Sequence, residues 1–421
     1  MTGSAPARLR VHTREISPVD DLVEYTDPNF PLVWLRRDEG MVGRGTVLRL
    51  DAGAASTEPR TVSLARAWAE LAAVAEIDDE VRLPGTGLVG FGALTFDERS
   101  AADSSIIVPG LIIGRRGGRS WLTSISLHDD EGEDAAAEPI AYGPYWSATL
   151  GPGALDPDGY QAAVELGLKA IEAGEVGKVV LARDIVGTIP EGADLRRLPR
   201  ELSTGYPDTW TFAVDGLIGA CPETLVTTHA GRVTARVLAG TFARGADAEE
   251  DAAARATLAA SAKNLDEHAY AVQSVVDALG PHTTTLSADD EPFTLELPNV
   301  WHLATDVEGT LSNGSSSLDL VAALHPTAAV AGTPTDAAIE AIRRIEPFDR
   351  RRYAGPVGWI DAAGDGEWAI ALRCAQFEHE SVGGVIPVAA HAGAGIVAGS
   401  EPEAELLETR VKFRPIVDAL A

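Results

Sequence analysis

The sequence predicts a large globular protein of mixed α/β or α+β class, and three observations support this prediction. The chain has 421 residues, of which 45% are hydrophobic and 23% are charged, so it is long enough to bury a large core. Stretches with helical and with strand periodicity are interleaved from residue 151 onward. No tandem repeat or low-complexity tract interrupts the sequence, which argues against a repeat array.

The expected elements follow from apolar periodicity and from turn residues. Residues 1–150 carry short strand-like pieces separated by Gly, Asp and Ser, with one helix at 62–76. The acidic segment 131–144 is the best internal boundary, so we predict a β-rich structural part at 1–150 and a part with the candidate chemistry at 151–421. In this second part we expect helices at 157–174, about 250–279, 334–346 and from 401, and strands from 178 and near 209–228, 232–238, 355–361 and 367–375.

Charge and cysteine content exclude several classes of protein. The formal net charge is −29, and such a chain would be repelled by nucleic acid and by anionic membranes. Two cysteines give no disulfide framework, which fits a reducing compartment. The N-terminal residues lack an apolar signal core, and no run reaches the roughly 20 apolar residues that span a bilayer. We therefore expect a cytoplasmic protein.

The segment 175–185, EVGKVVLARDI, reads as a buried strand that carries cations. Strand alternation places two sets of side chains on opposite faces, namely Lys178, Val180 and Ala182 on one face and Val179, Leu181 and Arg183 on the other. One interpretation is a functional lysine. The alternative is a strand-edge lysine whose ammonium group reaches water.

The C-terminal helix presents three charged side chains on one face. Glu405, Glu408 and Lys412 follow one another at spacings of three and four residues. One interpretation is a solvated face with an ion pair between Glu408 and Lys412. The other is a ligand site, because the preceding glycine-rich segment 391–399 leaves backbone amides that can approach a ligand closely.

The long helix offers a second pair of oxygen ligands. Asn264 and Glu267 have the same three-residue spacing as Glu405 and Glu408. Two helices that each present hard oxygen ligands can hold Mg²⁺, although spacing alone does not show that the helices meet. His268 and His302 belong to no zinc-type ligand pattern.

Taken together, nine motifs in a fixed order carry a family resemblance. They are KVVLAR (178–183), CPETLV (221–226), LAGTFARG (238–245), KNLDEHAYAV (263–272), WHLATDVEGTL (301–311), LHPTAAVAGTP (324–334), RRIEPFDRRRYAGPVGW (343–359), WAIALRCA (368–375) and HAGAGIVAGSEPEAELLET (391–409). This set resembles the chorismate-utilising enzymes, which are anthranilate synthase component I-like, and within them most resembles the isochorismate synthases. The resemblance implies an α+β fold of two intertwined subdomains, with large, mostly antiparallel sheets packed face to face, helices outside and the site between them.

The resemblance also implies catalytic roles for two residues. In the family reaction, water adds at C2 of chorismate while the C4 hydroxyl departs, so one group takes a proton and another gives one. Lys178 resembles the base that activates the water, and Glu223 resembles the acid that protonates the leaving hydroxyl. Enclosure beside a substrate carboxylate would raise the pKa of Glu223. Without the other motifs, Glu223 reads as a turn residue after Pro222.

Substrate and metal contacts are carried over in the same way. The positions that match the family pocket are Gly240, Thr241, His302, Thr333, Tyr353, Arg373, Gly393, Ala394, Gly395 and Lys412. For His302 a core histidine beside Trp301 is the alternative. The positions implied for Mg²⁺ are Asn264, Glu267, Glu405 and Glu408. Family members usually carry an acidic residue where this chain has Asn264, which predicts a lower affinity for the metal.

Two positions favour water as the nucleophile. Ala239 stands where the aminodeoxychorismate synthases that attack with a lysine carry that lysine, and anthranilate synthases lack a lysine at the position of Lys178. We therefore expect a Mg²⁺-dependent isochorismate synthase that acts on chorismate as a monomer, without a glutamine amidotransferase. A salicylate synthase, which also eliminates pyruvate, and a non-catalytic chorismate-binding homologue are the alternatives. The pathway, to menaquinone or to a siderophore, stays open.

Overall fold

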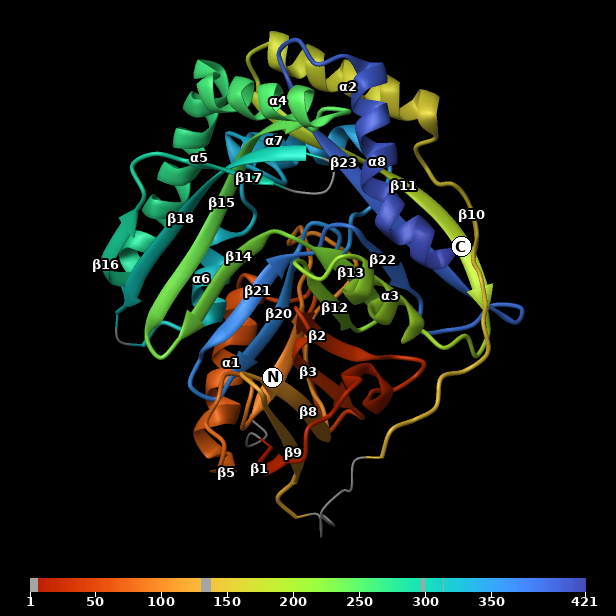
Figure 1. The fold of residues 1–421 in the computed structure, drawn as a ribbon, viewed down its shortest axis with the longest axis vertical. Helices are drawn as coiled ribbons and strands as arrows, with labels where there is room; N and C mark the ends of the chain where they lie inside the picture. Colours follow the sequence, from red (N-terminus) through yellow and green to blue (C-terminus); the bar gives the residue numbers. More distant parts are fainter. Residues whose placement is uncertain (1–6, 130–137, 297–299, 313) are drawn as a thin grey trace.

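Two large β-sheets form the body of the protein, as the computed structural model shows (Figure 1). The structure describes residues 7–129, 138–296, 300–312 and 314–421, and the side chains of Thr241, Lys263, Glu267 and Val300 also lie outside this description. Among the described strand pairs, β1 with β5 is parallel and the others are antiparallel. Large, mostly antiparallel sheets with outer helices confirm the predicted α+β fold.

The first sheet has 13 strands and draws them from the whole length of the chain. In spatial order they are β10 (Thr149–Pro152), β11 (Lys178–Pro190), β23 (Val385–Val397), β22 (Cys374–Phe377), β13 (Leu217–Cys221), β12 (Trp210–Val214), β2 (Leu32–Arg36), β3 (Glu39–Arg44), β8 (Leu111–Arg116), β9 (Arg119–Leu127), β1 (Leu9–Ile16) and β5 (Glu76–Asp79), with β19 (Gly332–Thr333) paired to β11.

The second sheet has ten strands, and it too combines early and late segments. Its order is β16 (Thr283–Ala288), β18 (Val300–Leu311), β15 (Arg232–Ala243), β14 (Thr224–His229), β21 (Gly366–Ile370), β20 (Pro356–Asp361), β6 (Val89–Ala93), β7 (Ser104–Val108) and β4 (Leu48–Ala52), with β17 (Phe293–Glu296) paired to β18. Strands from both sides of residue 150 thus share both sheets. Residues 131–137, half of the predicted boundary segment 131–144, lie outside the described residues.

The helices cover the outer faces of the sheets. They are α1 (Arg60–Val74), α2 (Pro157–Glu172), α3 (Arg197–Gly205), α4 (Ala248–Ala260), α5 (Ala262–Leu279), α6 (Ser317–Leu324), α7 (Thr335–Ile345) and α8 (Pro402–Leu420), with 3₁₀ turns η1 (Leu22–Tyr25) and η2 (Gly280–His282). In Figure 1, α2 and α8 lie over β11 and β23 at the upper right, and α4 and α5 lie beside β15 and β18 at the upper left.

The prediction of one long helix at 250–279 was wrong, because the segment forms two helices. Ser261 lies between α4 and α5 with an extended backbone, and its hydroxyl accepts a hydrogen bond from the amide of Asn264 at 3.3 Å. A serine in this position satisfies an amide at the start of the second helix, so it ends one helix and begins the next.

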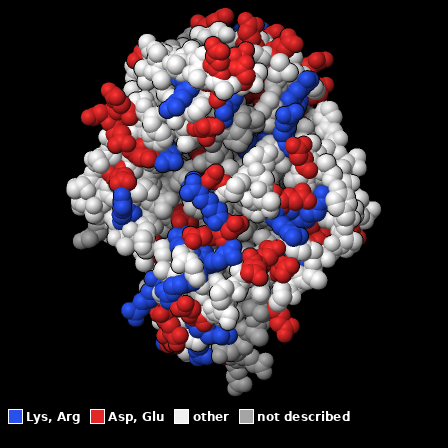
Figure 2. All heavy atoms as spheres, viewed as in Figure 1, with Lys and Arg blue, Asp and Glu red and all other residues white. Residues whose placement is uncertain are grey.

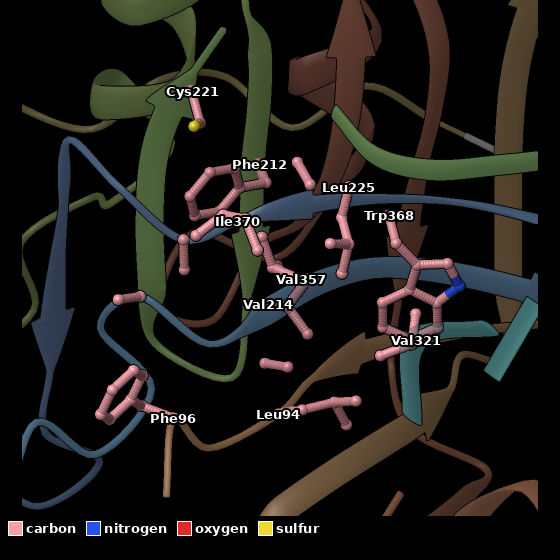
Figure 3. Close-up of a cluster of buried hydrophobic side chains, with 14 of the residues drawn as sticks. Leu94, Phe96, Phe212, Val214, Cys221, Leu225, Val321, Val357, Trp368 and Ile370 are labelled. Carbon is pink, nitrogen blue, oxygen red and sulfur yellow. The ribbon is translucent and has the colours of Figure 1, made fainter. Parts of the chain in front are cut away.

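The largest core cluster lies between the two sheets (Figure 3). Phe212 and Val214 belong to β12 of the 13-stranded sheet, while Val357, Trp368 and Ile370 belong to β20 and β21 of the other. All five side chains are buried and belong to one cluster. Burial of apolar surface from both sheets therefore joins the two halves of the fold.

The surface carries dispersed charge. On the face drawn in Figure 2, acidic side chains are scattered over the whole outline, with Lys and Arg among them. Both cysteines, Cys221 and Cys374, are buried free thiols, as the lack of a disulfide framework predicts. Within the described ranges, the helices are all too short or too polar to cross a membrane.

Candidate active site

Lys178 begins the strand β11, and the two faces of this strand differ as the sequence predicts. Val179 and Leu181 are buried on the face covered by α2, where a Cβ atom at Gly167 would stand 3.2 and 3.1 Å from their side chains. On the other face, a Cβ atom at Gly395 would stand 3.0 Å from Cε of Lys178. The glycine therefore leaves room for the lysine side chain to lie across β23.

The pairing of β11 with β23 points two glycine amides away from β11. The amide of Val180 donates to the carbonyl of Ala331 at 2.8 Å, and the amide of Ala182 donates to a carboxylate at 2.7 Å. Both amides thus face away from β23. Gly395 and Gly393 lie opposite these two residues and so occupy non-hydrogen-bonded pairs of the antiparallel ladder. Their own amides and carbonyls face the other edge of β23.

Between these two glycines, Ala394 has the opposite orientation. It pairs with Leu181 in a position where the ladder directs the amide toward β11, and its side chain is buried. The glycine-rich segment therefore presents the amides of Gly393 and Gly395, rather than three successive amides, at the edge of β23.

That edge of β23 is reached by a lysine from α8. β22 pairs with β23 only through Val388, Ala389 and Ala390, so in the described part of the chain no strand pairs with the edge at Gly393. Lys412 donates from Nζ to the carbonyl of Gly393 at 2.8 Å and pairs with Glu408 at 2.6 Å. The ion pair predicted from the helix spacing is present, and the same lysine also contacts the strand.

Glu223 lies just beyond β13 and is subject to three positive charges. Its withdrawal from water raises the pKa of its carboxyl, and the charges of Lys412, Arg373 and Lys178 each lower that pKa without cancelling the rise. The structure therefore brings the predicted acid and the predicted base into one electrostatic environment with two further cations. A carboxyl with a raised pKa holds its proton at a higher pH than an ordinary glutamate does.

His302 lies in β18 and belongs to the same environment. Desolvation, with the charges of Arg373 and Lys412, lowers the pKa of His302 to about 4, while a backbone hydrogen bond with Gly240 and the charge of Glu408 act in the opposite direction. The imidazole is therefore neutral near pH 7. His302 is paired across the ladder with Thr241, whose side chain lies outside the described residues.

Gly240 forms a bulge in β15 that brings α5 close to the sheet. The register with β18 shifts between Ala239 and Thr241, and Gly240 has a φ of 77°, where a side chain would be strained. A Cβ atom there would stand 3.2 Å from Cβ of Asn264. His268 secures the bulge by hydrogen bonds to the Ala239 carbonyl at 3.1 Å and to a threonine hydroxyl at 2.8 Å, which makes it a core histidine.

Tyr353, Arg373 and Thr333 complete the predicted substrate positions. Tyr353 is buried, and burial raises the pKa of its hydroxyl while the charge of Arg373 acts against that rise. Arg373 has a φ of 50°, an uncommon backbone conformation that recurs at functional sites. Thr333 pairs with Lys178 through β19, so it borders the first residue of β11.

The predicted metal ligands are only partly described. Burial and the carboxylate of Glu408 raise the pKa of Glu405, although a hydrogen bond from Ser400 partly offsets this. Asn264 donates from its amide nitrogen to Ser261 at 2.9 Å, and the side chain of Glu267 lies outside the described residues. Among the side chains that are described, no three of His, Cys, Asp or Glu gather closely enough to hold a metal.

A separate cavity lies apart from this site. It measures about 920 Å³ and is lined by residues of α4 and β17 together with Trp301. Trp301 and His302 are neighbours in β18, and neighbours in a strand point to opposite faces. The cavity therefore lies on the opposite side of the sheet from His302.

Sequence reasoning missed three residues that support the site, namely Glu346, Arg350 and His391. His391 stacks on the ring of Tyr353 with the ring centroids 5.2 Å apart. Its position two residues before Gly393, on the same face of a strand, was the available signal. Glu346 and Arg350 form a buried ion pair, and their four-residue spacing was visible inside a motif.

Comparison with known proteins identifies the family. The model of the family described as chorismate binding enzyme matches residues 8–421. The chain belongs to the chorismate-binding enzymes. Isochorismate synthase DhbC of Bacillus subtilis is 39% identical to this chorismate-binding enzyme over 341 residues, which are 78% of this chain and 80% of that protein.

Solved structures agree with this assignment. DhbC from Bacillus anthracis matches with a TM-score of 0.74 and 32% identity, covering 95% of this chain and 98% of that one. MenF, the menaquinone-specific isochorismate synthase from Escherichia coli, matches with a TM-score of 0.78 and 25% identity, covering 100% of this chain and 97% of that one. The predicted family and fold are both confirmed.

Proposed function

We propose that this protein is an isochorismate synthase, which converts chorismate to isochorismate. The observation that carries the proposal is that Lys178 lies against Gly395 and Lys412 binds the Gly393 carbonyl, so that two lysines meet at one stretch of β23. The charges of both lysines also act on the carboxyl of Glu223. The names of the similar proteins support it, because those reported above are isochorismate synthases.

The proposed reaction balances one proton taken and one proton given. Lys178, in its neutral amine form, takes a proton from water as the water oxygen bonds to C2 of chorismate. Both ring double bonds shift, and the C4 hydroxyl leaves with a proton from Glu223 as water. The raised pKa of Glu223 supports its role as the acid, because a carboxyl must be protonated in order to donate.

Binding of the substrate follows from local charge. Chorismate is a dianion, and the protein has a net charge of −29, so it must place cations and amides where the substrate lies. Arg373 can bind one carboxylate through two parallel hydrogen bonds. Lys412 and the amides of Gly393 and Gly395 supply further donors at the edge of β23. Neutral His302 and the hydroxyls of Tyr353 and Thr333 offer uncharged contacts.

We also propose Mg²⁺ as the cofactor. Glu405 and Glu408 lie one turn apart on α8, so their two carboxylates repel each other. A divalent cation bound by both carboxylates would relieve this repulsion. Asn264 and Glu267 are the proposed partners from α5. When bound, Mg²⁺ supplies positive charge for a substrate carboxylate.

Three further properties belong to the same proposal. A water-using enzyme needs no ammonia, so we propose that it acts without a glutamine amidotransferase subunit. We also propose that it acts as a monomer. Two buried free thiols support a reducing compartment, and we propose the cytoplasm.

Incubation of the purified protein with chorismate tests the proposal, with Mg²⁺ in one arm and EDTA in the other, and with products separated by chromatography and assigned by NMR. We expect isochorismate with Mg²⁺ and none with EDTA. Salicylate with equimolar pyruvate would assign the protein to salicylate synthesis instead, and unchanged chorismate in both arms would contradict the proposal.

Metal binding needs a separate measurement. Calorimetric titration of the protein with MgCl₂ should show binding that the Glu408→Gln variant weakens, because the substitution removes one charged oxygen ligand. Equal binding by both proteins would exclude Glu408 as a ligand, whatever the activity assay shows.

A further inference from the structure

Arg350 is a buried guanidinium that joins three segments of the chain around the candidate site. It donates to both carboxylate oxygens of Glu346 at 2.6 and 2.8 Å. It also donates to the carbonyl of Val180 at 2.7 Å and to the carbonyl of Val330 at 3.0 Å. One side chain thus binds β11 and the segment that leads into β19.

Glu346 completes the contact from the other end of the ion pair. Its Oε1 accepts the hydrogen bond from the amide of Ala182 at 2.7 Å. Together the two side chains therefore bind the carbonyl of Val180 and the amide of Ala182. These are neighbouring backbone groups on the edge of β11 that faces away from β23. β19 pairs only with Lys178 and Val179, so the two side chains continue that edge where β19 ends.

This arrangement lies beside the proposed reactive groups. The backbone groups of β11 that bind Glu346 and Arg350 face away from β23, and in the same register Gly393 and Gly395 direct their amides to the open edge. Lys178 is two residues before Val180 on the same strand face. Val330 is three residues before Thr333, which pairs with Lys178.

We propose that the buried Glu346–Arg350 pair is a positioning device for the reaction, which sets the place of Lys178 and the direction of the Gly393 and Gly395 amides. Neither residue touches the reacting atoms. Their effect on turnover passes through β11, and the inference rests on the proposed function, since it assigns them a part in that reaction.

A second ion pair in the chain offers a matched control. Arg196 donates to both oxygens of Asp194 at 2.9 and 2.6 Å and to the carbonyls of Ile140 and Ala141 at 2.8 and 2.9 Å. The side chains of Arg196 and Asp194 are 0% and 6% exposed, and those of Arg350 and Glu346 are similarly buried, with 3% and 1% exposed. The contacts of Arg196 are to segments that carry none of the candidate site residues.

The test compares Arg350→Lys with Arg196→Lys in the full-length protein. Lysine keeps the charge in both variants but cannot bind a carboxylate and separate carbonyls together. At a temperature where both are folded, we expect the kcat of Arg350→Lys to fall about 10- to 100-fold, as misplacement of a reacting group does. Its KM for chorismate should change less, and Arg196→Lys should keep the wild-type kcat.

Several outcomes would overturn the inference. An unchanged kcat in Arg350→Lys would do so, and so would an equal fall in both variants, which would mark a general loss of order. If Arg350→Lys does not fold, Glu346→Gln is tested instead, because its amide oxygen can still accept the hydrogen bond from Ala182. An unchanged kcat in Glu346→Gln would also overturn the inference. If the wild type makes no isochorismate, the proposed function fails first, and the two failures are thereby separated.

Discussion

Two carboxylates at opposite ends of one strand behave in opposite ways. Asp215 lies in the turn before β13, and Glu223 lies just after that strand. Both are beside several cations, yet the pKa of Asp215 is held far below its usual range and that of Glu223 is raised. The comparison separates a structural carboxylate from a candidate catalytic one.

The difference lies in how the cations make contact. Burial alone would raise the pKa of Asp215, but Arg49 binds both of its oxygens at 2.6 and 2.7 Å, Arg352 donates at 2.6 Å and His379 lies at 2.8 Å. Among the described residues, Lys412, Arg373 and Lys178 affect the pKa of Glu223 through their charge alone. Direct hydrogen bonds outweigh desolvation, whereas charges at a distance do not.

The largest expected effect on turnover comes from Lys178→Met. Removing the proposed base should lower kcat by about 10²- to 10⁴-fold, the usual contribution of a general base. Lys169→Met is the matched control, because Lys169 is an exposed lysine in α2 and its removal changes the net charge equally. Steady-state kinetics with chorismate measure both, and undiminished turnover in Lys178→Met would remove it as the base.

Glu223→Gln should lower turnover by about 10²-fold or more while leaving the fold at least as stable. A carboxyl whose folded-state pKa is raised stabilises the fold at low pH, and this contribution is lost as the pH rises through that pKa. The variant should therefore gain in Tm relative to wild type as the pH rises. A variant that is both active and less stable at neutral pH would reverse the assignment of Glu223.

Asp215→Asn should have the smallest effect on turnover and a large effect on stability. Breaking a buried charge pair costs about 3–5 kcal/mol of unfolding free energy. Because the pKa of Asp215 is depressed in the fold, its contribution is present above the unfolded value of about 3.9 and is lost as the pH falls. Thermal unfolding at pH 7 and below pH 4 should show a difference from wild type that narrows in acid.

Motifs and the chemistry of single residues predicted part of the candidate site. Lys178 and Glu223 share an environment as expected, and helical spacing anticipated the ion pair of Glu408 with Lys412. The break at Ser261 was missed because apolar periodicity continues across it, while a single hydrogen bond to the amide of Asn264 decides the outcome.

Contacts between distant segments could not be read from the sequence. Arg350 meets Val180 across 170 residues of chain, and Asp215 meets Arg49 across 166. Neither pairing has a periodic or compositional signal, because each depends on which strands become neighbours in the sheets. The direction of the Gly393 and Gly395 amides likewise depends on the register between β11 and β23, which pairs thirteen residues of each strand.

In the proposed reaction, the new hydroxyl at C2 comes from water activated by Lys178, while Glu223 protonates the hydroxyl that leaves C4. Conversion of chorismate in water enriched in oxygen-18, followed by mass spectrometry of the isolated isochorismate, tests it most directly. We predict a product that carries one labelled oxygen, placed at C2. A product without label would show that the oxygen moved within the substrate, and would contradict this account.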